Sequence, residues 1–182
     1  MAAIEHCEGI VVRILPYSES SLITTWITDG QGIIQVLIRG IRKPRQKNFD
    51  TVDLLNQSNL IYSTNRRSHL HTAREIKCIQ PHREIATDYT KLLACTYCYE
   101  VSAMLVEPDT PIQDIYQLYL KAIDYLATHD VSLELIERFE CRLMILLGLR
   151  QESLSIQQIR QQHYPKTPKS WQALQKSLSP PS

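Results

Sequence analysis

The sequence predicts an α+β protein in two parts, a β-rich barrel or sandwich at the N-terminus followed by an all-α bundle. The first eighty residues contain five short β-branched runs separated by turns and loops, with no helical period between them. After Pro81 the apolar residues recur at helical spacing instead. The charge changes at the same place, because residues 1–80 hold ten basic and seven acidic side chains, whereas residues 81–152 hold six and twelve.

Five segments are predicted as strands because they are short, apolar and rich in β-branched residues. They are Gly9–Leu15, Leu22–Thr28, Ile33–Ile38, Val52–Thr64 and His69–Ile79. Pro16 is expected to end the first strand, and the Asp29-Gly-Gln-Gly32 stretch predicts a hairpin loop between the second and the third. Five such strands in succession favour a small antiparallel barrel or sandwich.

Three amphipathic helices are expected to follow. The first runs from Arg83 to Val106, and the second opens at Thr110-Pro111, where a hydroxyl cap precedes a proline in the first turn. The third begins at Ser132 and closes at Gly148, a residue that suits the left-handed position after a helix. Each helix needs the apolar face of another, so the three are predicted to form a bundle.

The last thirty residues carry four basic side chains and no acidic one. Ser155 is a candidate cap for a short helix, and Trp171, Leu174 and Leu178 mark one face of another. Two prolines near the end predict that the last residues are frayed. The sequence therefore divides into a β domain (1–80), a helical domain (81–152) and a short helical tail (153–182).

Several classes of protein are excluded by composition. No apolar run approaches the ~20 residues that a membrane helix needs, and the N-terminus lacks a basic-then-apolar signal pattern. Five scattered cysteines do not form a disulfide framework, so we expect a soluble protein of a reducing compartment.

The sequence also predicts no enzyme, cofactor or metal. It contains no phosphate-binding glycine loop and no hydrolase or metalloprotease motif. Glu134, Glu137 and Glu140 recur every three residues, which is typical of a solvated helix face. Cys95 and Cys98 have half of a zinc spacing, but they lie within a helical pattern and are expected to be buried as small apolar residues.

The strongest functional signal is the basic run Arg39–Lys47, which carries five cations among nine residues at the end of a predicted strand. Lys and Arg displace counterions from phosphates, although an isolated basic run is often only a solvated loop. A second basic group, Arg66, Arg67 and Arg74, lies around the start of the fifth strand. If both groups flank one side of a barrel, that side suits a nucleic acid.

Few aromatic residues are placed to stack on bases. Tyr17, beside the end of the first strand, is the better candidate, whereas Trp26 lies within an apolar strand and is expected in the core. His69 and His71 share one face of a strand, but the nearby arginines would repel a metal cation. Phosphate contact or simple exposure is expected for both histidines.

Four stretches resemble a known family. Gly9-Ile-Val-Val-Arg13, Pro16-Tyr-Ser-Glu-Ser-Ser-Leu22 and Arg39-Gly-Ile-Arg-Lys43 are similar to the N-terminal region of the bacterial recombination mediator RecO. The run Arg138-Phe-Glu-Cys-Arg-Leu-Met-Ile-Leu-Leu-Gly-Leu149 resembles its central helical region. The resemblance covers about residues 8–149 and implies a five-stranded oligonucleotide-binding (OB) barrel followed by a helical domain.

The resemblance also implies a function. Proteins of this family bind single- and double-stranded DNA, anneal complementary strands and help to place RecA, usually with RecR, on DNA coated by the single-stranded-DNA-binding protein SSB. The expected DNA-binding residues are Arg39, Arg42, Lys43, Arg45, Lys47, Arg66, Arg67, Arg74 and Tyr17. The family docks the acidic SSB tail on the helical domain, where Arg138, Phe139, Arg142 and Leu143 are the matching residues. Such a protein would act in the bacterial cytoplasm, at the nucleoid.

Two departures distinguish the sequence from that family. Many RecO proteins continue with a four-cysteine zinc module and more helices, whereas Gln151-Glu-Ser-Leu154 follows here and no cysteine comes after Cys141. We therefore expect a shortened form without the zinc site. A protein-interaction adaptor with little DNA affinity is the alternative, favoured by the net charge of +1 and the few aromatic residues. An RNA-binding barrel is a third possibility.

Overall fold

The computed structural model describes residues 3–40, 49–50, 52–65, 67–112, 114–150 and 154–179. The chain forms two compact units. The barrel unit comprises Met1–Arg83 and Pro108–Tyr116, and the helical unit comprises Glu84–Glu107 and Gln117–Ser182. We call Pro108–Tyr116 the connecting segment. In the part of the chain described, no helix is long and apolar enough to span a membrane.

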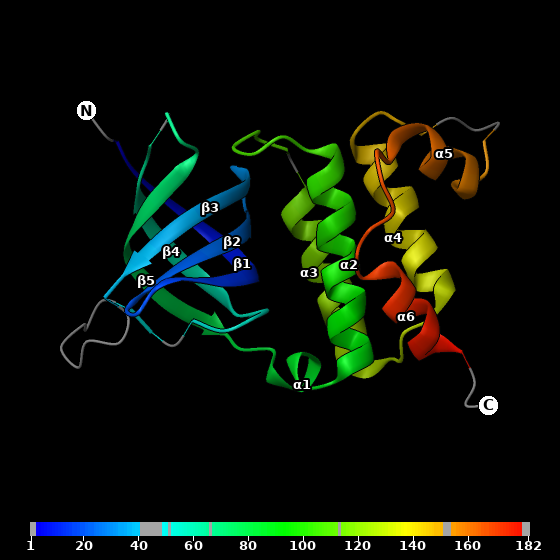
Figure 1. The fold of residues 1–182 in the computed structure, drawn as a ribbon, viewed down its shortest axis with the longest axis horizontal. Helices are drawn as coiled ribbons and strands as arrows, with labels where there is room; N and C mark the ends of the chain where they lie inside the picture. The colour runs from blue at the N-terminus through cyan, green and yellow to red at the C-terminus, as the bar shows by residue number, and fades with distance from the viewer. Residues whose placement is uncertain are drawn as a thin grey trace. The chain divides into compact units, whose positions relative to one another are not determined.

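Five strands close into a barrel, as the sequence predicts (Figure 1). They are β1 (Ile4–Ser18), β2 (Ser21–Thr28), β3 (Gly32–Arg39), β4 (Gln57–Ser63) and β5 (Leu70–Gln80). The strands pair in the order β1-β2-β3-β5-β4, and β4 closes the barrel by pairing with β1. All pairs are antiparallel except β3 with β5, so the expectation of a fully antiparallel barrel is wrong at that one pair.

Three predicted strand boundaries are wrong by three residues or more, and the first is the start of β1, which lies at Ile4 and not at Gly9. Pro16 does not end β1, which continues to Ser18 and still pairs with β2. The pairing of β1 with β4 ends at Ile10, so from there on the β1 edge that faces away from β2 is not paired with β4. Proline is tolerated on such an edge. β4 begins at Gln57 and not at Val52, because Leu55 adopts a positive φ of 64° that interrupts extended backbone.

The barrel core contains Trp26, as predicted, with its side chain 0% exposed. The indole Nε1 donates to Thr24 Oγ1 (2.7 Å), and that hydroxyl in turn donates to the carbonyl of Val36 (3.0 Å). The polar atom of the largest core side chain is therefore satisfied, which burial requires. The core cluster consists of Cys7, Val11, Trp26, Ile34, Val36, Ile38, Leu60, Tyr62, Ala73 and Ile76.

The described residues of the connecting segment are not helical before Ile115, so the helix predicted to open at Thr110-Pro111 begins later. Asp109 and Asp114 have φ values of 58° and 72°, which a right-handed helix excludes. The Asp109 N–H donates to the carbonyl of Ile33 in β3 (3.0 Å). Contacts with the barrel strands therefore outweigh the local capping signal.

The helical unit is built from α-helices, and three of the described helices have a side-chain N-cap (Figure 1). They are α1 (Arg83–Ala86), α2 (Tyr89–Leu105), α3 (Ile115–Thr128), α4 (Leu133–Leu146), α5 (Ile156–His163) and α6 (Trp171–Leu178). Ser132 caps α4 as predicted, and Ser155 forms a full capping box on α5. Gly148 has a φ of 68°, and its N–H and that of Leu149 bond back to the last turn of α4, a Schellman closure that confirms the predicted stop.

α4 and α6 pack on α2, and α5 packs on α4. Tyr119 of α3 donates its hydroxyl to the Cys95 carbonyl (2.8 Å) and meets Phe139 of α4 edge-on. Cys95 and Cys98 are buried in α2, as predicted, and burial raises the pKa of the Cys95 thiol to about 12. Both sulfurs therefore belong to the apolar interior of the helical unit.

One of the three glutamates of α4 contradicts the solvated-face prediction. Glu140 is 1% exposed, and its carboxylate accepts hydrogen bonds from the hydroxyls of Tyr97 and Tyr164, both at 2.8 Å. Arg160 of α5 donates to the same carboxylate through Nε (3.0 Å) and Nη2 (2.5 Å). The period-three pattern missed this because α5, which covers Glu140, comes from a distant part of the sequence.

Candidate nucleic-acid interface

The basic run is attached to the barrel at two described points. The chain leaves β3 at Arg39 and returns at Phe49, which forms a parallel bridge with Ile76 of β5. The last β5 residue that pairs with β3 is Thr72. Thr72 pairs with Leu37, two residues before Arg39. Arg74 lies midway between Thr72 and Ile76, and is therefore between the β5 residues that pair with the chain before and after the basic run.

Arg74 is exposed, and its Nε donates to Ser63 Oγ of β4 (2.7 Å), which steadies the side chain on the barrel surface. Arg39 is exposed at the last position of β3. Arg74 of β5 and Arg39, the first residue of the basic run, are therefore both exposed near the place where the run is attached to the barrel. The other cations of these groups, Arg42, Lys43, Arg45, Lys47 and Arg66, lie outside the described residues.

Tyr17 lies at the same end of the barrel as Arg39. It is the extra residue of a β-bulge, because Pro16 pairs with Leu22 and Ser18 pairs with Ser21. Ser21 in turn pairs with Arg39 across β2 and β3. A bulge re-aims the side chain of its extra residue, and the Tyr17 side chain is 62% exposed. An aromatic ring is therefore available for stacking near the point where the basic run begins.

Arg67 lies toward the other end of β3. Its loop is joined to the connecting segment by His69, and the connecting segment is bonded to Ile33 at the start of β3. Gly32 to Arg39 is seven steps of roughly 3.3 Å, so the two ends of β3 are roughly 23 Å apart. The structure therefore does not bring Arg67 together with Arg39 and Arg74.

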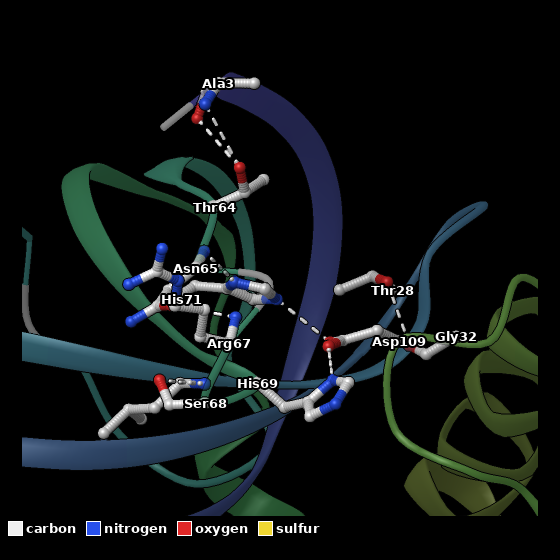
Figure 2. A network of polar contacts seen from close by, with 11 residues as sticks. Ala3, Thr28, Gly32, Thr64, Asn65, Arg67, Ser68, His69, His71 and Asp109 are labelled. Atoms are coloured by element: carbon white, nitrogen blue, oxygen red, sulfur yellow. Dashed lines mark hydrogen bonds and ion pairs between the residues drawn. The ribbon is translucent and has the colours of Figure 1, made fainter. Parts of the chain in front are cut away.

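His69 and His71 both bind Asp109 (Figure 2). His71 is buried, which corrects the expectation of exposure for that residue, whereas the His69 side chain is 61% exposed, as expected. His69 Nδ1 is 2.5 Å from Asp109 Oδ2, and His71 Nε2 is 2.9 Å from Oδ1. The Asn65 N–H donates to His71 Nδ1 (3.0 Å), so Nε2 carries the His71 proton and donates to the carboxylate. Asp109 is 38 residues beyond His71, and no local pattern indicates the pairing.

This cluster fixes the connecting segment on the barrel and engages both ring nitrogens of His71 and Nδ1 of His69. In the same loop, the backbone N–H of Arg67 donates to Asn65 Oδ1 (3.1 Å). The guanidinium of Arg67 points away from Asp109 (Figure 2). Arg67 is thus an exposed cation held on an ordered turn.

The residues matched to the partner site lie on α4. Arg138 and Arg142 are exposed, and Arg138 donates to Glu134 (2.6 Å) within the same helix. Phe139 and Leu143 are core residues, 4% and 0% exposed. An apolar seat for a partner on α4 would therefore have to come from exposed residues such as Ile145, which is 58% exposed.

Two family models match the chain. Residues 1–82 match the model described as Recombination protein O N terminal, and residues 86–152 match the one described as Recombination protein O C terminal. The chain belongs to the RecO family. The two matches correspond closely to the barrel and to α2 through α4, and they confirm the resemblance seen in the sequence.

Curated relatives carry the name DNA repair protein RecO. The chain is 26% identical to the one from Syntrophus aciditrophicus over 146 residues, 80% of this chain and 56% of that protein. It is 25% identical to the relative from Halalkalibacterium halodurans over the same shares. It is 29% identical to the relative from Xanthomonas euvesicatoria over 69% of this chain and 51% of that protein. The chain spans about half the length of these RecO relatives.

Proposed function

We propose that this RecO chain is a non-enzymatic DNA repair mediator that binds single- and double-stranded DNA and anneals complementary strands. The observation that supports it is the attachment of the basic run around Arg39 and Arg74, on a barrel of the RecO family. Cations there neutralise phosphates by releasing counterions, and Tyr17 supplies a ring on which a base can stack.

Annealing needs no bond-making chemistry. Two strands repel each other through their phosphates, and a protein that neutralises one backbone lowers the cost of bringing the second strand close. The proposed path of the strand runs along the β3 side of the barrel. The basic run and Arg74 hold it near the end of β3, and Arg67 holds it toward the start of β3.

The proposed partners follow from the family. They are SSB, whose acidic tail would meet Arg138 and Arg142 on α4, RecR, and RecA on SSB-coated DNA. The proposed place of action is the bacterial cytoplasm, at the nucleoid. Phe139 and Leu143 would support this site from within the core, since neither is exposed.

A protein-interaction adaptor is the second candidate, favoured by the net charge of +1. Titration of labelled single-stranded DNA at low and moderate salt, with and without the SSB tail peptide, separates the two. A mediator binds DNA saturably and loses affinity as salt rises. An adaptor binds the peptide and shows no saturable DNA binding. Repeating the titration with RNA of the same sequence tests the ligand class.

A further inference from the structure

The helical unit contains a cavity that the proposed function does not use. Its volume is about 290 Å³. Tyr97 of α2 forms one part of it, and the rest comes from α5, α6 and the stretch between them. The lining residues are Tyr97, Arg160, Gln161, Tyr164, Lys166, Thr167, Pro168 and Trp171. All but Tyr97 lie beyond residue 152, where the family match ends.

Hydrogen bonds to a buried carboxylate hold several lining side chains of the cavity in place. The buried carboxylate of Glu140 accepts hydrogen bonds from three of the lining side chains, those of Tyr97, Arg160 and Tyr164. Burial and the Glu140 charge raise the pKa of the Tyr97 and Tyr164 hydroxyls, so both remain donors at neutral pH. The Arg160 guanidinium lies 4.9 Å from the centre of the Trp171 ring, and Tyr97 lies 5.0 Å from the same ring. The site is therefore formed before any ligand arrives.

The chemistry of the lining combines aromatic surface with positive charge. Trp171 and Tyr164 supply two half-buried rings, whereas Tyr97 is 1% exposed and packs against Trp171. Arg160 has its charge balanced by Glu140. Lys166 is exposed and, among the described residues, has neither a hydrogen-bond nor an ion-pair partner. None of the described residues that line the cavity is acidic, and residues 153–182 contain no Asp or Glu. A planar aromatic ligand with a negative charge complements this surface.

We propose that this cavity binds a nucleotide, with the base against the aromatic rings and the phosphate at Lys166. A volume near 300 Å³ is at the lower end for small-molecule sites, so one nucleotide is the appropriate size. The nucleotide can be a free nucleoside monophosphate or one residue of a DNA strand. This site is separate from the DNA contacts proposed on the barrel and does not depend on them.

Tryptophan fluorescence provides the test on the full chain. The sequence has two tryptophans; Trp26 is fully buried in the barrel, and Trp171 lines the cavity. Titration with 2′-deoxyadenosine 5′-monophosphate, and separately with a short oligo(dA), should quench Trp171 saturably. Quenching by the mononucleotide identifies a free-nucleotide site, and quenching by the oligonucleotide alone identifies a site for DNA. If neither quenches, the proposal is wrong.

Lys166→Ala should lower the affinity measured by the quenching titration about tenfold, as expected when one charge-assisted hydrogen bond is removed. Lys176→Ala is the matched control, because it removes the same charge from α6 at a position outside the cavity lining, and it should change affinity less than twofold. Equal losses in the two variants would show only non-specific charge attraction and would overturn the site.

Saturable quenching by an acidic peptide, with none by nucleotide or DNA, would also overturn the proposal. The barrel variant Arg39→Ala should still bind the mononucleotide, which separates this proposal from DNA binding by the barrel.

Discussion

Replacing Arg160 with alanine is expected to lower the free energy of unfolding of the helical unit by about 3 kcal/mol. The Glu140 carboxylate is 1% exposed and would lose the one cation bonded to it in the described structure. Burial alone would lower the pKa of Arg160, but the hydrogen bonds and charge of Glu140 outweigh it and raise that pKa. The loss stays at the lower end for a broken buried pair because the hydroxyls of Tyr97 and Tyr164 still donate to the carboxylate.

The matched control is Arg138→Ala. Arg138 pairs with Glu134 at 2.6 Å, almost the separation of the Arg160–Glu140 pair, but both side chains are 71% exposed. An exposed pair of this kind contributes about 0.3–0.5 kcal/mol. Urea unfolding followed by circular dichroism at 222 nm reports on the helices, whereas Trp171 fluorescence would respond to the loss of Arg160 itself. Equal losses in the two variants would contradict a structural role for the buried pair.

Gly32→Ala should destabilise the barrel unit by about 3 kcal/mol or more. Gly32 has a φ of 69°, where an L-residue is strained by about 1–2 kcal/mol. A Cβ there would also lie 2.1 Å from the Thr110 carbonyl oxygen, so the connecting segment would have to move. The effect is larger than at an ordinary turn glycine because the backbone strain and the clash with Thr110 both act at this position.

Gly30→Ala in the same hairpin measures the backbone strain alone. Gly30 has a φ of 90°, and a Cβ there meets no atom within 4 Å, so the expected loss is about 1–2 kcal/mol. The measurement is urea unfolding followed by Trp26 fluorescence in a Trp171→Phe background, which leaves one tryptophan in the barrel core. If the two alanine variants unfold at the same urea concentration, the packing of the connecting segment on Gly32 is refuted.

The strands and the main helices were predictable because their signals are local. The β-branched runs and the glycines at positions 30 and 32 identify the β2–β3 hairpin, and the structure gives both glycines positive φ values. Gly148 likewise marks the end of α4 through its own backbone conformation. These features depend on a few adjacent residues, which a sequence displays directly.

The parts that the sequence did not reveal depend on contacts between distant residues. Asp109 is hydrogen-bonded to His69 and His71, which are 40 and 38 residues away in the sequence. Glu140 is hydrogen-bonded to Arg160, which is 20 residues away. For the candidate interface, the grouping of Arg74 with Arg39 follows from the parallel pairing of β3 with β5, which the strand patterns did not indicate. The separation of Arg67 from Arg39 follows from the same register.

The basic run is the centre of the DNA-binding account, and the salt dependence of DNA affinity tests it most directly. The variant replaces Arg39, Arg42, Lys43 and Arg45 with alanine, and Arg138→Ala/Arg142→Ala on the helical unit is the control. The account predicts weaker binding and a log–log salt slope that falls by roughly 0.7–0.9 for each phosphate that the variant no longer neutralises, with the control slope unchanged. A basic-run variant that keeps the wild-type slope would contradict the account.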